Sequence, residues 1–343
     1  MKKNSKILNT LKKSGTLSLS RFIFLCLYEK NYGYYQKNRI GTDFITAPEI
    51  SQLFGECISI FIASINQKIG NIRDFCELGP GNGTLTKDLS KNLNKLIKDE
   101  LNFYLFEKSN SLKANIKKNT NKINISYLKN LTLPPKPIFF IANEFFDALP
   151  INQFEKTSEG WFERRIDLIN GKLKLILKKN TSYKFNKDYG KKGDIDEISP
   201  FTNLYLKKIF SHLKKFGGGL LIFDYGPLKK KKIDTLQSIF KRKKSYFLNN
   251  PYDSDITYHV DFEKIKQQAF ESNLLFYGPI TQKKFLFFNG INERYIKLSK
   301  RLQSKNQLEI LNSQFNRLTD ARGMGNLIKC TFITKKKIEL SFF

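Results

Sequence analysis

Three glycines at every second position are the residues of this sequence most suited to chemistry. Gly79, Gly81 and Gly83 follow a short apolar run that contains Glu77, and they precede a helical pattern. Glycine is needed where the backbone turns with positive φ or comes within contact distance of a ligand. In α/β folds, a strand that feeds such a loop with a helix behind it holds an adenosine-bearing cofactor. The loop therefore predicts such a site without naming the cofactor.

The residues around the loop narrow the choice. A dinucleotide fingerprint, G-x-G-x-x-G, would require a third glycine where this chain has Thr84, which disfavours a dehydrogenase. A second predicted strand, Leu101 to Phe106, ends on Glu107, and a carboxylate there can accept both ribose hydroxyls. An E-x-G-x-G-x-G loop with a later acid resembles motif I of S-adenosylmethionine-dependent methyltransferases. The alternative is an ordinary tight turn, with Glu107 as a surface charge.

The elements that must position this loop alternate between strands and helices. Such alternation predicts an α/β fold with a parallel-rich, Rossmann-like sheet covered by helices on both faces. The expected strands of this sheet lie at 73–78, 103–106, 123–127, 137–142 and 220–223. A short antiparallel β insertion is expected at 152–177, and helices are expected at 201–216 and 261–272. The segment 183–200 is expected as a loop and 228–255 as a basic excursion without a clear element. Closing strands are expected at 274–276, 285–286 and 326–334.

The first 70 residues are predicted to be helical, with no strand. Thr46 and Glu49 have the spacing of a capping box, with Pro48 in the first turn, before a long amphipathic helix. The predicted domains are therefore a helical N-terminal or lid region at 1–70 and a methyltransferase-like core at 71–343. The core would carry insertions at about 151–200 and 228–260.

Polar and acidic residues follow the later strands. Asn143, Glu144 and Asp147 come after the fourth strand, and Asp224 ends the fifth. In an open α/β sheet, ligands bind outside the carboxyl ends of the strands. Carboxylates gathered there suit a cationic acceptor, because a guanidinium needs paired oxygens for its fork of donors. The alternative for Glu144 and Asp147 is that they only cap the next helix.

Composition excludes several other classes. The formal net charge of +29 comes overwhelmingly from Lys spread along the whole chain, so we interpret it as a solvated surface and expect no nucleic-acid partner. No apolar run approaches the ~20 residues of a membrane span. We expect no secretory signal and no transit peptide. The protein is therefore expected to be cytoplasmic. The four cysteines, Cys26, Cys57, Cys76 and Cys330, are scattered and are expected to be reduced and buried.

Several blocks together are similar to the MidA family of class I S-adenosylmethionine-dependent methyltransferases, whose members include the mitochondrial methyltransferase that assists complex I assembly. The matching blocks, in chain order, are YGYY at 32–35, GTDFITAPEISQLFGE at 41–56, the glycine loop at 77–84, NEFFDALP at 143–150, Asp224-Tyr225-Gly226, DITYHVDF at 255–262, Thr281-Gln282 with Phe285-Leu286, Gly290-Ile291 and Met324-Gly325. The chain departs from the family pattern at Tyr258 and in its Lys-rich surface. TAPEISQLFGE together with NEFFDALP makes the resemblance specific.

The resemblance implies S-adenosylmethionine as cofactor and, in mitochondrial relatives, dimethylation of an arginine in a subunit of respiratory complex I. The cofactor would lie against Glu77, the three glycines, Glu107 and Asn143. Glu144, Asp147 and Asp224 would orient the acceptor, and Asp43, Thr46, Pro48 and Glu49 would form a lid or acceptor-side wall. His259 is a candidate proton acceptor or a structural residue, and His212 is expected to be structural. No cluster has metal-ligand spacing, so no metal is expected.

Three other functions remain open from the sequence. A nucleic-acid or glutamine methyltransferase often has Asn/Asp-Pro-Pro-Tyr/Phe at the end of the fourth strand, whereas Glu-Phe-Phe follows Asn143 here. A catalytically silent assembly factor would use the fold only to bind a client. A dehydrogenase is the third, and Thr84 disfavours it.

Overall fold

The chain divides into two compact units. The N-terminal unit comprises Met1–Asp43, Asp147–Tyr205 and Lys230–His259, and the sheet unit comprises Phe44–Phe146, Leu206–Lys229 and Val260–Phe343. The computed structural model describes residues 5–37, 45–121, 123–186 and 188–343.

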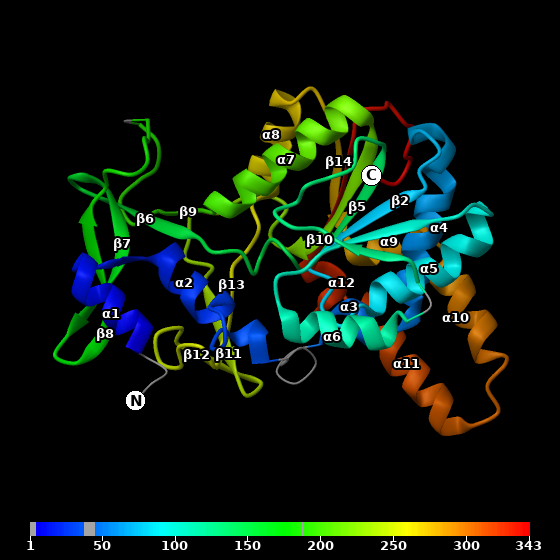
Figure 1. Ribbon diagram of the computed structural model, residues 1–343, viewed down its shortest axis with the longest axis horizontal. Coiled ribbons are helices and arrows are strands. Elements are labelled where there is room, and N and C mark those ends of the chain that lie inside the picture. Colours follow the sequence, from blue (N-terminus) through cyan, green and yellow to red (C-terminus); the bar gives the residue numbers. More distant parts are fainter. Residues whose placement is uncertain (1–4, 38–44, 122, 187) are drawn as a thin grey trace. The chain divides into compact units, whose positions relative to one another are not determined.

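A seven-stranded sheet forms the centre of the sheet unit (Figure 1). Its order is β14-β15-β10-β5-β2-β3-β4, with parallel pairing from β10 to β4 and antiparallel pairing of β15 with both of its neighbours. The chain order of the strands reverses between β2 and β5, the kind of switch point at which α/β sheets bind ligands. The strands are β2 (Asp74–Leu78), β3 (Asn102–Phe106), β4 (Ile125–Tyr127), β5 (Ile138–Asn143), β10 (Gly218–Tyr225), β14 (Leu275–Thr281) and β15 (Ile328–Thr334).

Helices cover both faces of this sheet (Figure 1). On one face, Phe61 of α4 contacts Phe285 of α9 with ring centroids 5.2 Å apart. On the other, Phe140 of β5 meets His212 of α7 edge-on at 5.7 Å. The helices that begin or lie in this unit are α3 (Ala47–Ile50), α4 (Gln52–Ile69), α5 (Thr84–Ile97), α6 (Asn110–Asn119), α8 (Phe262–Glu271), α9 (Gln282–Phe288), α10 (Ile291–Ser299), α11 (Lys305–Thr319) and α12 (Met324–Leu327), and α7 (Pro200–Phe216) continues into it.

Two expectations for this unit were wrong in detail. The pair Phe285-Leu286 lies in helix α9 and not in a strand, because Thr281 caps that helix by accepting a hydrogen bond from the Lys284 N–H at 3.1 Å. A short apolar run carries no period that separates a buried strand from a buried helix. The helix expected from residue 46 onward is interrupted at Ser51, whose extended backbone separates α3 from α4.

The N-terminal unit is mostly antiparallel sheet. One sheet has the order β1-β7-β6-β9, with β8 on the other side of β7, and a second has the order β12-β11-β13. Its elements are α1 (Ser5–Ser14), β1 (Leu17–Ser18), α2 (Leu19–Tyr28), η1 (Tyr34–Lys37), β6 (Asn152–Thr157), β7 (Gly160–Ile169), β8 (Lys172–Lys179), β9 (Ile195–Ile198), β11 (Gln237–Phe240), β12 (Lys243–Ser245) and β13 (Asp255–Thr257). Strands β1, β9, β11, β12 and β13 were not predicted, because two to four residues are too few to show alternation.

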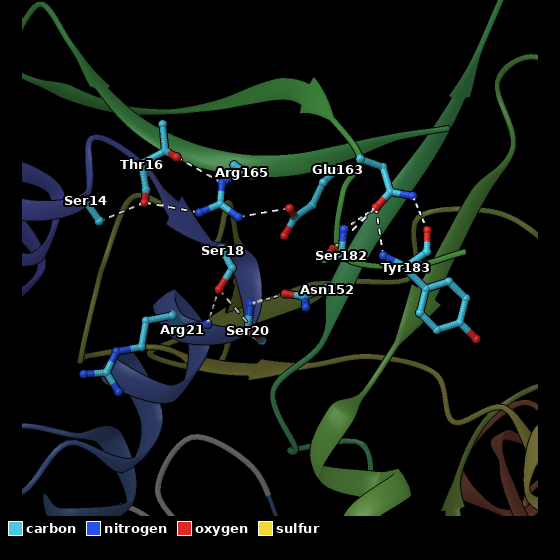
Figure 2. A network of polar contacts seen from close by, with 11 residues as sticks. Ser14, Thr16, Ser18, Ser20, Arg21, Asn152, Glu163, Arg165, Ser182 and Tyr183 are labelled. Carbon is cyan, nitrogen blue, oxygen red and sulfur yellow. Dashed lines mark hydrogen bonds and ion pairs between the residues drawn. The ribbon is translucent and has the colours of Figure 1, made fainter. Parts of the chain in front are cut away.

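A polar network fastens the start of the chain to this sheet (Figure 2). The Arg165 guanidinium donates to the Thr16 hydroxyl at 3.0 Å, to its carbonyl oxygen at 3.3 Å and to the Glu163 carboxylate at 2.9 Å. A few residues further on, the Ser20 N–H donates to the Asn152 side chain at 3.0 Å. Residues near the N-terminus therefore join a sheet whose other strands come from 152–198.

The compact units group the chain differently from the predicted domains. Residues 44–69 belong to the sheet unit, while the first 43 residues join 147–205 and 230–259, the two regions expected as insertions. The physical reason is the pairing of β1 with β7, at Leu17 with Ile166 and Ser18 with Arg165. A two-residue strand leaves no signal in the sequence that could reveal its distant partner.

Candidate functional site

The glycine loop adopts a backbone that only glycine takes easily. Gly79, Gly81 and Gly83 have φ values of +66°, +56° and +80°, between β2 and α5. A Cβ atom added to Gly79 would lie 2.8 Å from Cδ2 of Phe145, closer than real Cβ contacts. The loop therefore needs glycine for its conformation, and at Gly79 also for space.

The predicted acid lies directly beside this loop. β2 and β3 are parallel and in register, Leu78 with Phe106, and the Gly79 N–H donates to the Phe106 carbonyl at 3.0 Å. Glu107 follows Phe106, and its carboxylate accepts a hydrogen bond from the Ser109 N–H at 2.7 Å. Burial raises the pKa of Glu107 to about 7, against the opposing effect of the N–H donors of Ser109 and Lys108. The tip of β3 thus presents a carboxylate next to the loop, where a ribose diol can bind.

Glu77 supports the loop from beneath. Its buried carboxylate accepts hydrogen bonds from the hydroxyl and the N–H of Thr86, in the first turn of α5. Burial raises the pKa of Glu77 to about 7. This side chain joins the strand before the loop to the helix after it.

At the tip of β5, Asn143 carries a buried polar atom with no partner. The side chain is 8% exposed, and its Oδ1 has no hydrogen-bond donor among the described residues. Its Nδ2 donates to Oε1 of Glu144 at 3.3 Å. A buried acceptor without a donor costs stability unless a ligand supplies one. Beside the glycine loop, this oxygen fits the ammonium group of an amino-acid-bearing cofactor.

Glu144 combines a strained backbone with a fixed side chain. Its φ is +49°, in the left-handed region that few residues other than glycine and asparagine adopt. Its N–H donates to the Phe223 carbonyl on β10 at 2.8 Å, and its Oε1 accepts from the Ala47 N–H at 3.1 Å. Strain of this kind is found where surrounding contacts enforce it, often at functional sites. Neighbouring elements thus place the Glu144 carboxylate at the strand tips.

The predicted lid segment is held against the loop. Oε1 of Glu49 accepts from the Thr84 hydroxyl at 2.7 Å and from Nδ2 of Asn82 at 3.4 Å. Together with the bond from Ala47 to Glu144, this ties α3 to the glycine loop and to the tip of β5. α3, the glycine loop and the tip of β5 come from the block at 41–56, the glycine block and the block at 143–150, which the sequence analysis had singled out.

The capping box expected in this segment does not form. Thr46 precedes α3 with an extended backbone, but its side chain makes no cap bond, and Glu49 turns toward Thr84 instead. The cap of the long helix is Ser51, which accepts from the Leu53 N–H at 3.4 Å. Pro48 is buried in the first turn of α3. Asp43 lies outside the described residues.

Asp224 lies at the end of β10 with no exposed surface. Its Oδ2 accepts from the Phe146 N–H and its Oδ1 from the Tyr225 N–H, both at 2.9 Å. These bonds hold the turn that follows Glu144, so the geometry gives Asp224 a positioning role for that turn.

The two remaining predicted acceptor-side residues lie in the N-terminal unit. The Asp147 carbonyl accepts from the Tyr258 N–H at 3.1 Å, and the His259 N–H donates to the Thr235 hydroxyl at 2.9 Å. Asp147 is 5% exposed. The structure places His259 on the loop that follows β13.

The prediction missed Tyr35 and Asp255. The Tyr35 hydroxyl donates to Oδ1 of Asp255 at 2.8 Å. Burial, followed by the negative charges of Asp255 and Asp147 among other groups, raises the pKa of Tyr35 well above its usual value. Asp147, Tyr35 and Asp255 therefore lie near one another. Their presence in the blocks YGYY, NEFFDALP and DITYHVDF was the available signal.

His212 is packed as a structural residue. Its Nε2 lies 2.9 Å from the Lys136 carbonyl, and burial lowers its pKa. Among the residues that the structure describes, no three His, Cys, Asp or Glu side chains are arranged to hold a metal ion. In the same part of the chain, no helix is long and apolar enough to cross a membrane.

A seven-stranded mixed sheet with a glycine loop after its switch-point strand and an acid on the next strand is typical of class I S-adenosylmethionine-dependent methyltransferases. Residues 57–280 match the model of the family Methyltransf_28, described as "Putative S-adenosyl-L-methionine-dependent methyltransferase". The chain belongs to this family, which is that of MidA, and S-adenosylmethionine is its cofactor.

Several named relatives are arginine methyltransferases. The protein arginine methyltransferase NDUFAF7 of Xenopus tropicalis is 31% identical over 93% of this chain and 82% of its own length. Human NDUFAF7 is 29% identical over 83% of this chain and 72% of its own length. A crystal structure of a Burkholderia thailandensis protein bound to S-adenosyl-homocysteine is 21% identical and has a TM-score of 0.85, covering 98% of this chain and 92% of that one. This structure supports the fold.

Proposed function

We propose that this chain methylates an arginine side chain of a protein, with a subunit of respiratory complex I as the acceptor implied by the family resemblance. The observation that best supports this proposal is the carboxylate of Glu144, which hydrogen bonds hold at the strand tips beside the glycine loop. The names of the relatives, protein arginine methyltransferases, support the same acceptor class. A carboxylate suits a guanidinium better than a nucleobase or a neutral amide.

The chain's own residues fit the cofactor. The glycine loop lets the backbone approach it, and the Glu107 carboxylate would accept the ribose hydroxyls. The orphaned Oδ1 of Asn143 would accept a hydrogen bond from the ammonium group of its amino-acid part. When bound, S-adenosylmethionine supplies a methyl group on a positively charged sulfur, so no nucleophilic serine or cysteine is needed. The four cysteines are buried, and burial raises the pKa of Cys26 to about 12, which keeps that thiol protonated.

The main task of the protein is then to align the acceptor and exclude water. An arginine Nη of the acceptor would receive the methyl group, the bonding pair would stay with the donor sulfur, and the guanidinium would release a proton. Glu144 would pair with the guanidinium and orient one Nη, while Asp224 holds the turn that follows Glu144. Asp147, three residues further along the chain, is a second carboxylate for the acceptor, and His259 is the candidate that receives the proton.

The experiment uses a donor labelled on its methyl group. The purified chain is incubated with that donor and with a lysate of cells that lack the protein, and complete enzymatic digestion to single amino acids identifies the labelled residue. We expect label in one protein as methylarginine. The Glu144→Gln variant, which keeps the size of the side chain, should lose most of this label while it still binds the cofactor. Label in RNA would refute the arginine proposal in favour of a nucleic-acid methyltransferase. Label in protein as methylglutamine would refute it in favour of a glutamine methyltransferase.

A further inference from the structure

Glu197 is a buried carboxylate of the N-terminal unit that none of the family blocks contains. It lies in β9, and its side chain has no exposed surface. Burial raises the pKa of Glu197, against the opposing effects of the Lys230 charge and of hydrogen bonds from Thr235 and Gln153. Because a buried carboxylate is costly unless its partners compensate it, those partners indicate what the side chain is for.

The partners of this carboxylate either donate hydrogen bonds to it or carry positive charge. Its Oε1 accepts from Nε2 of Gln153 at 2.8 Å and from the Thr235 N–H at 3.0 Å. Its Oε2 accepts from the Thr235 hydroxyl, and Nζ of Lys230 lies 3.6 Å away from it. An ionised carboxylate can only accept, so the Thr235 hydroxyl has to point its single proton at Glu197.

The direction of that bond decides what else the Thr235 oxygen can do. Since its proton is committed to Glu197, the oxygen offers a lone pair to the His259 N–H, which donates to it at 2.9 Å. The preceding residue is held as well, because the Tyr258 N–H donates to the Asp147 carbonyl at 3.1 Å. The backbone of the candidate proton acceptor is therefore fixed from two directions.

Glu197 is itself held by the antiparallel sheet. It pairs directly with Gln153 of β6, whose Nε2 also donates to Oδ1 of Asp234 at 2.7 Å. From β7, Nη1 of Arg164 donates to Oε1 of Gln153 at 3.2 Å and to Oδ2 of Asp234 at 2.7 Å. Three neighbouring strands thus position the segment that carries Thr235, and a site supported by strands is placed more precisely than one supported by loops alone.

We propose that Glu197 and Thr235 are positioning residues of the methyl transfer, which hold the backbone of His259 where its ring receives the proton from the acceptor guanidinium. This inference rests on the proposed function, in which His259 takes up that proton. The two residues act through His259 and need no contact of their own with the acceptor. A displacement of about 1 Å far from the chemistry can slow a reaction roughly 100-fold, so the loss of this support is measurable.

The test reads His259 directly, because the chain has only two histidines, His212 and His259. Isotope-labelled histidine gives one ring signal from each in nuclear magnetic resonance spectra, and His212→Gln assigns them. Thr235→Val keeps the shape of the side chain and removes both bonds of its hydroxyl. We expect the His259 signal to shift in this variant and the His212 signal to stay in place.

The same variant is then assayed with methyl-labelled S-adenosylmethionine and the lysate of cells that lack the protein. At saturating donor, the formation of methylarginine should fall about 10- to 100-fold. Calorimetric titration should give the wild-type affinity for S-adenosylmethionine, because the residues that fit the cofactor belong to the sheet unit. Thr235→Ser keeps the hydroxyl and should restore both the His259 signal and the rate.

The matched control is Thr157→Val, at the end of β6 in the same unit. The Thr157 hydroxyl also makes one bond of each kind: it donates to the Gly160 carbonyl at 3.0 Å and accepts from the Glu159 N–H at 3.2 Å. This variant should change neither the His259 signal nor the rate. Glu197→Gln replaces one accepting oxygen by a donating amide, and it should act as Thr235→Val does.

An unmoved His259 signal in folded Thr235→Val or Glu197→Gln protein would overturn the proposal. A shifted signal with an unchanged rate would also overturn it, and so would an equal loss of rate in Thr157→Val. If the wild type forms no methylarginine, the arginine acceptor is refuted, and the histidine signals still decide whether this pair of residues fixes His259.

Discussion

The replacement of Gly79 by alanine tests the glycine loop most directly, because the structure separates two costs. The first is conformational: at φ +66° an alanine pays about 1–2 kcal/mol for the left-handed region. The second is steric: the new Cβ would lie 2.8 Å from the Phe145 ring, and such overpacking costs about 1–3 kcal/mol. The sum is roughly 2–5 kcal/mol.

Gly171→Ala is the matched control. Gly171 has a φ of +72°, but a Cβ there would meet no atom within 4 Å, so the variant pays only the conformational cost. Urea unfolding should show Gly79→Ala to be less stable than Gly171→Ala by about 1–3 kcal/mol. Calorimetric titration with S-adenosylmethionine should show at least tenfold weaker binding for Gly79→Ala and wild-type binding for Gly171→Ala.

Two results would refute this reasoning. Equal loss of stability in the two variants would mean that the Phe145 ring moves aside at no cost, so that the close packing seen at Gly79 carries no energy. Wild-type cofactor affinity in a folded Gly79→Ala protein would mean that the backbone of this loop does not contact the cofactor.

Three further predictions concern neighbouring residues. Glu49→Gln replaces a charged acceptor of the Thr84 hydroxyl by a neutral one, so calorimetric titration should show cofactor binding weakened about tenfold. Unchanged affinity would mean that α3 does not contribute to cofactor binding. Asp224→Asn leaves a poorer acceptor for the buried Phe146 N–H, so thermal unfolding should show a loss of about 1–3 kcal/mol. Burial raises the pKa of Glu77 from 4.5 to about 7. Between these values the folded protein binds more protons than the unfolded chain, so the stability that the protonated group provides is lost as pH rises through about 7. Glu77→Gln should therefore reduce the fall in the free energy of urea unfolding between pH 4.5 and about 7. An unchanged slope would mean that other groups cause this pH dependence.

The fold class followed from the order of motifs, since the apolar run before Gly79, the helix after it and Glu107 at the next strand end could be read directly. The expected helices at 201–216 and 261–272 correspond to α7 and α8 within a residue or two. Long periodic segments carry their own signal. The strands of the β11–β12 hairpin were missed, because three or four residues cannot display a period and their pairing depends on a partner elsewhere.

The site was predicted as a set of residues, but their individual tasks were not. Glu49 was expected to cap its own helix, yet its carboxylate contacts Thr84, 35 residues away in the sequence. Tyr35 and Asp255 were overlooked as a pair because 220 residues separate them. Hydrogen-bond partners of this kind depend on how loops are brought together by the sheet, which no local pattern records.

By itself, the sequence determined the loop, the acid on the next strand and the blocks that mark the family, because backbone conformation at glycine and the ends of strands are local properties. Tertiary structure alone decided which side chains meet: the Glu49 carboxylate with the glycine loop, the Glu144 carboxylate with α3, and β1 with β7. These contacts join segments far apart in the chain, so their energies depend on packing that only the folded protein provides.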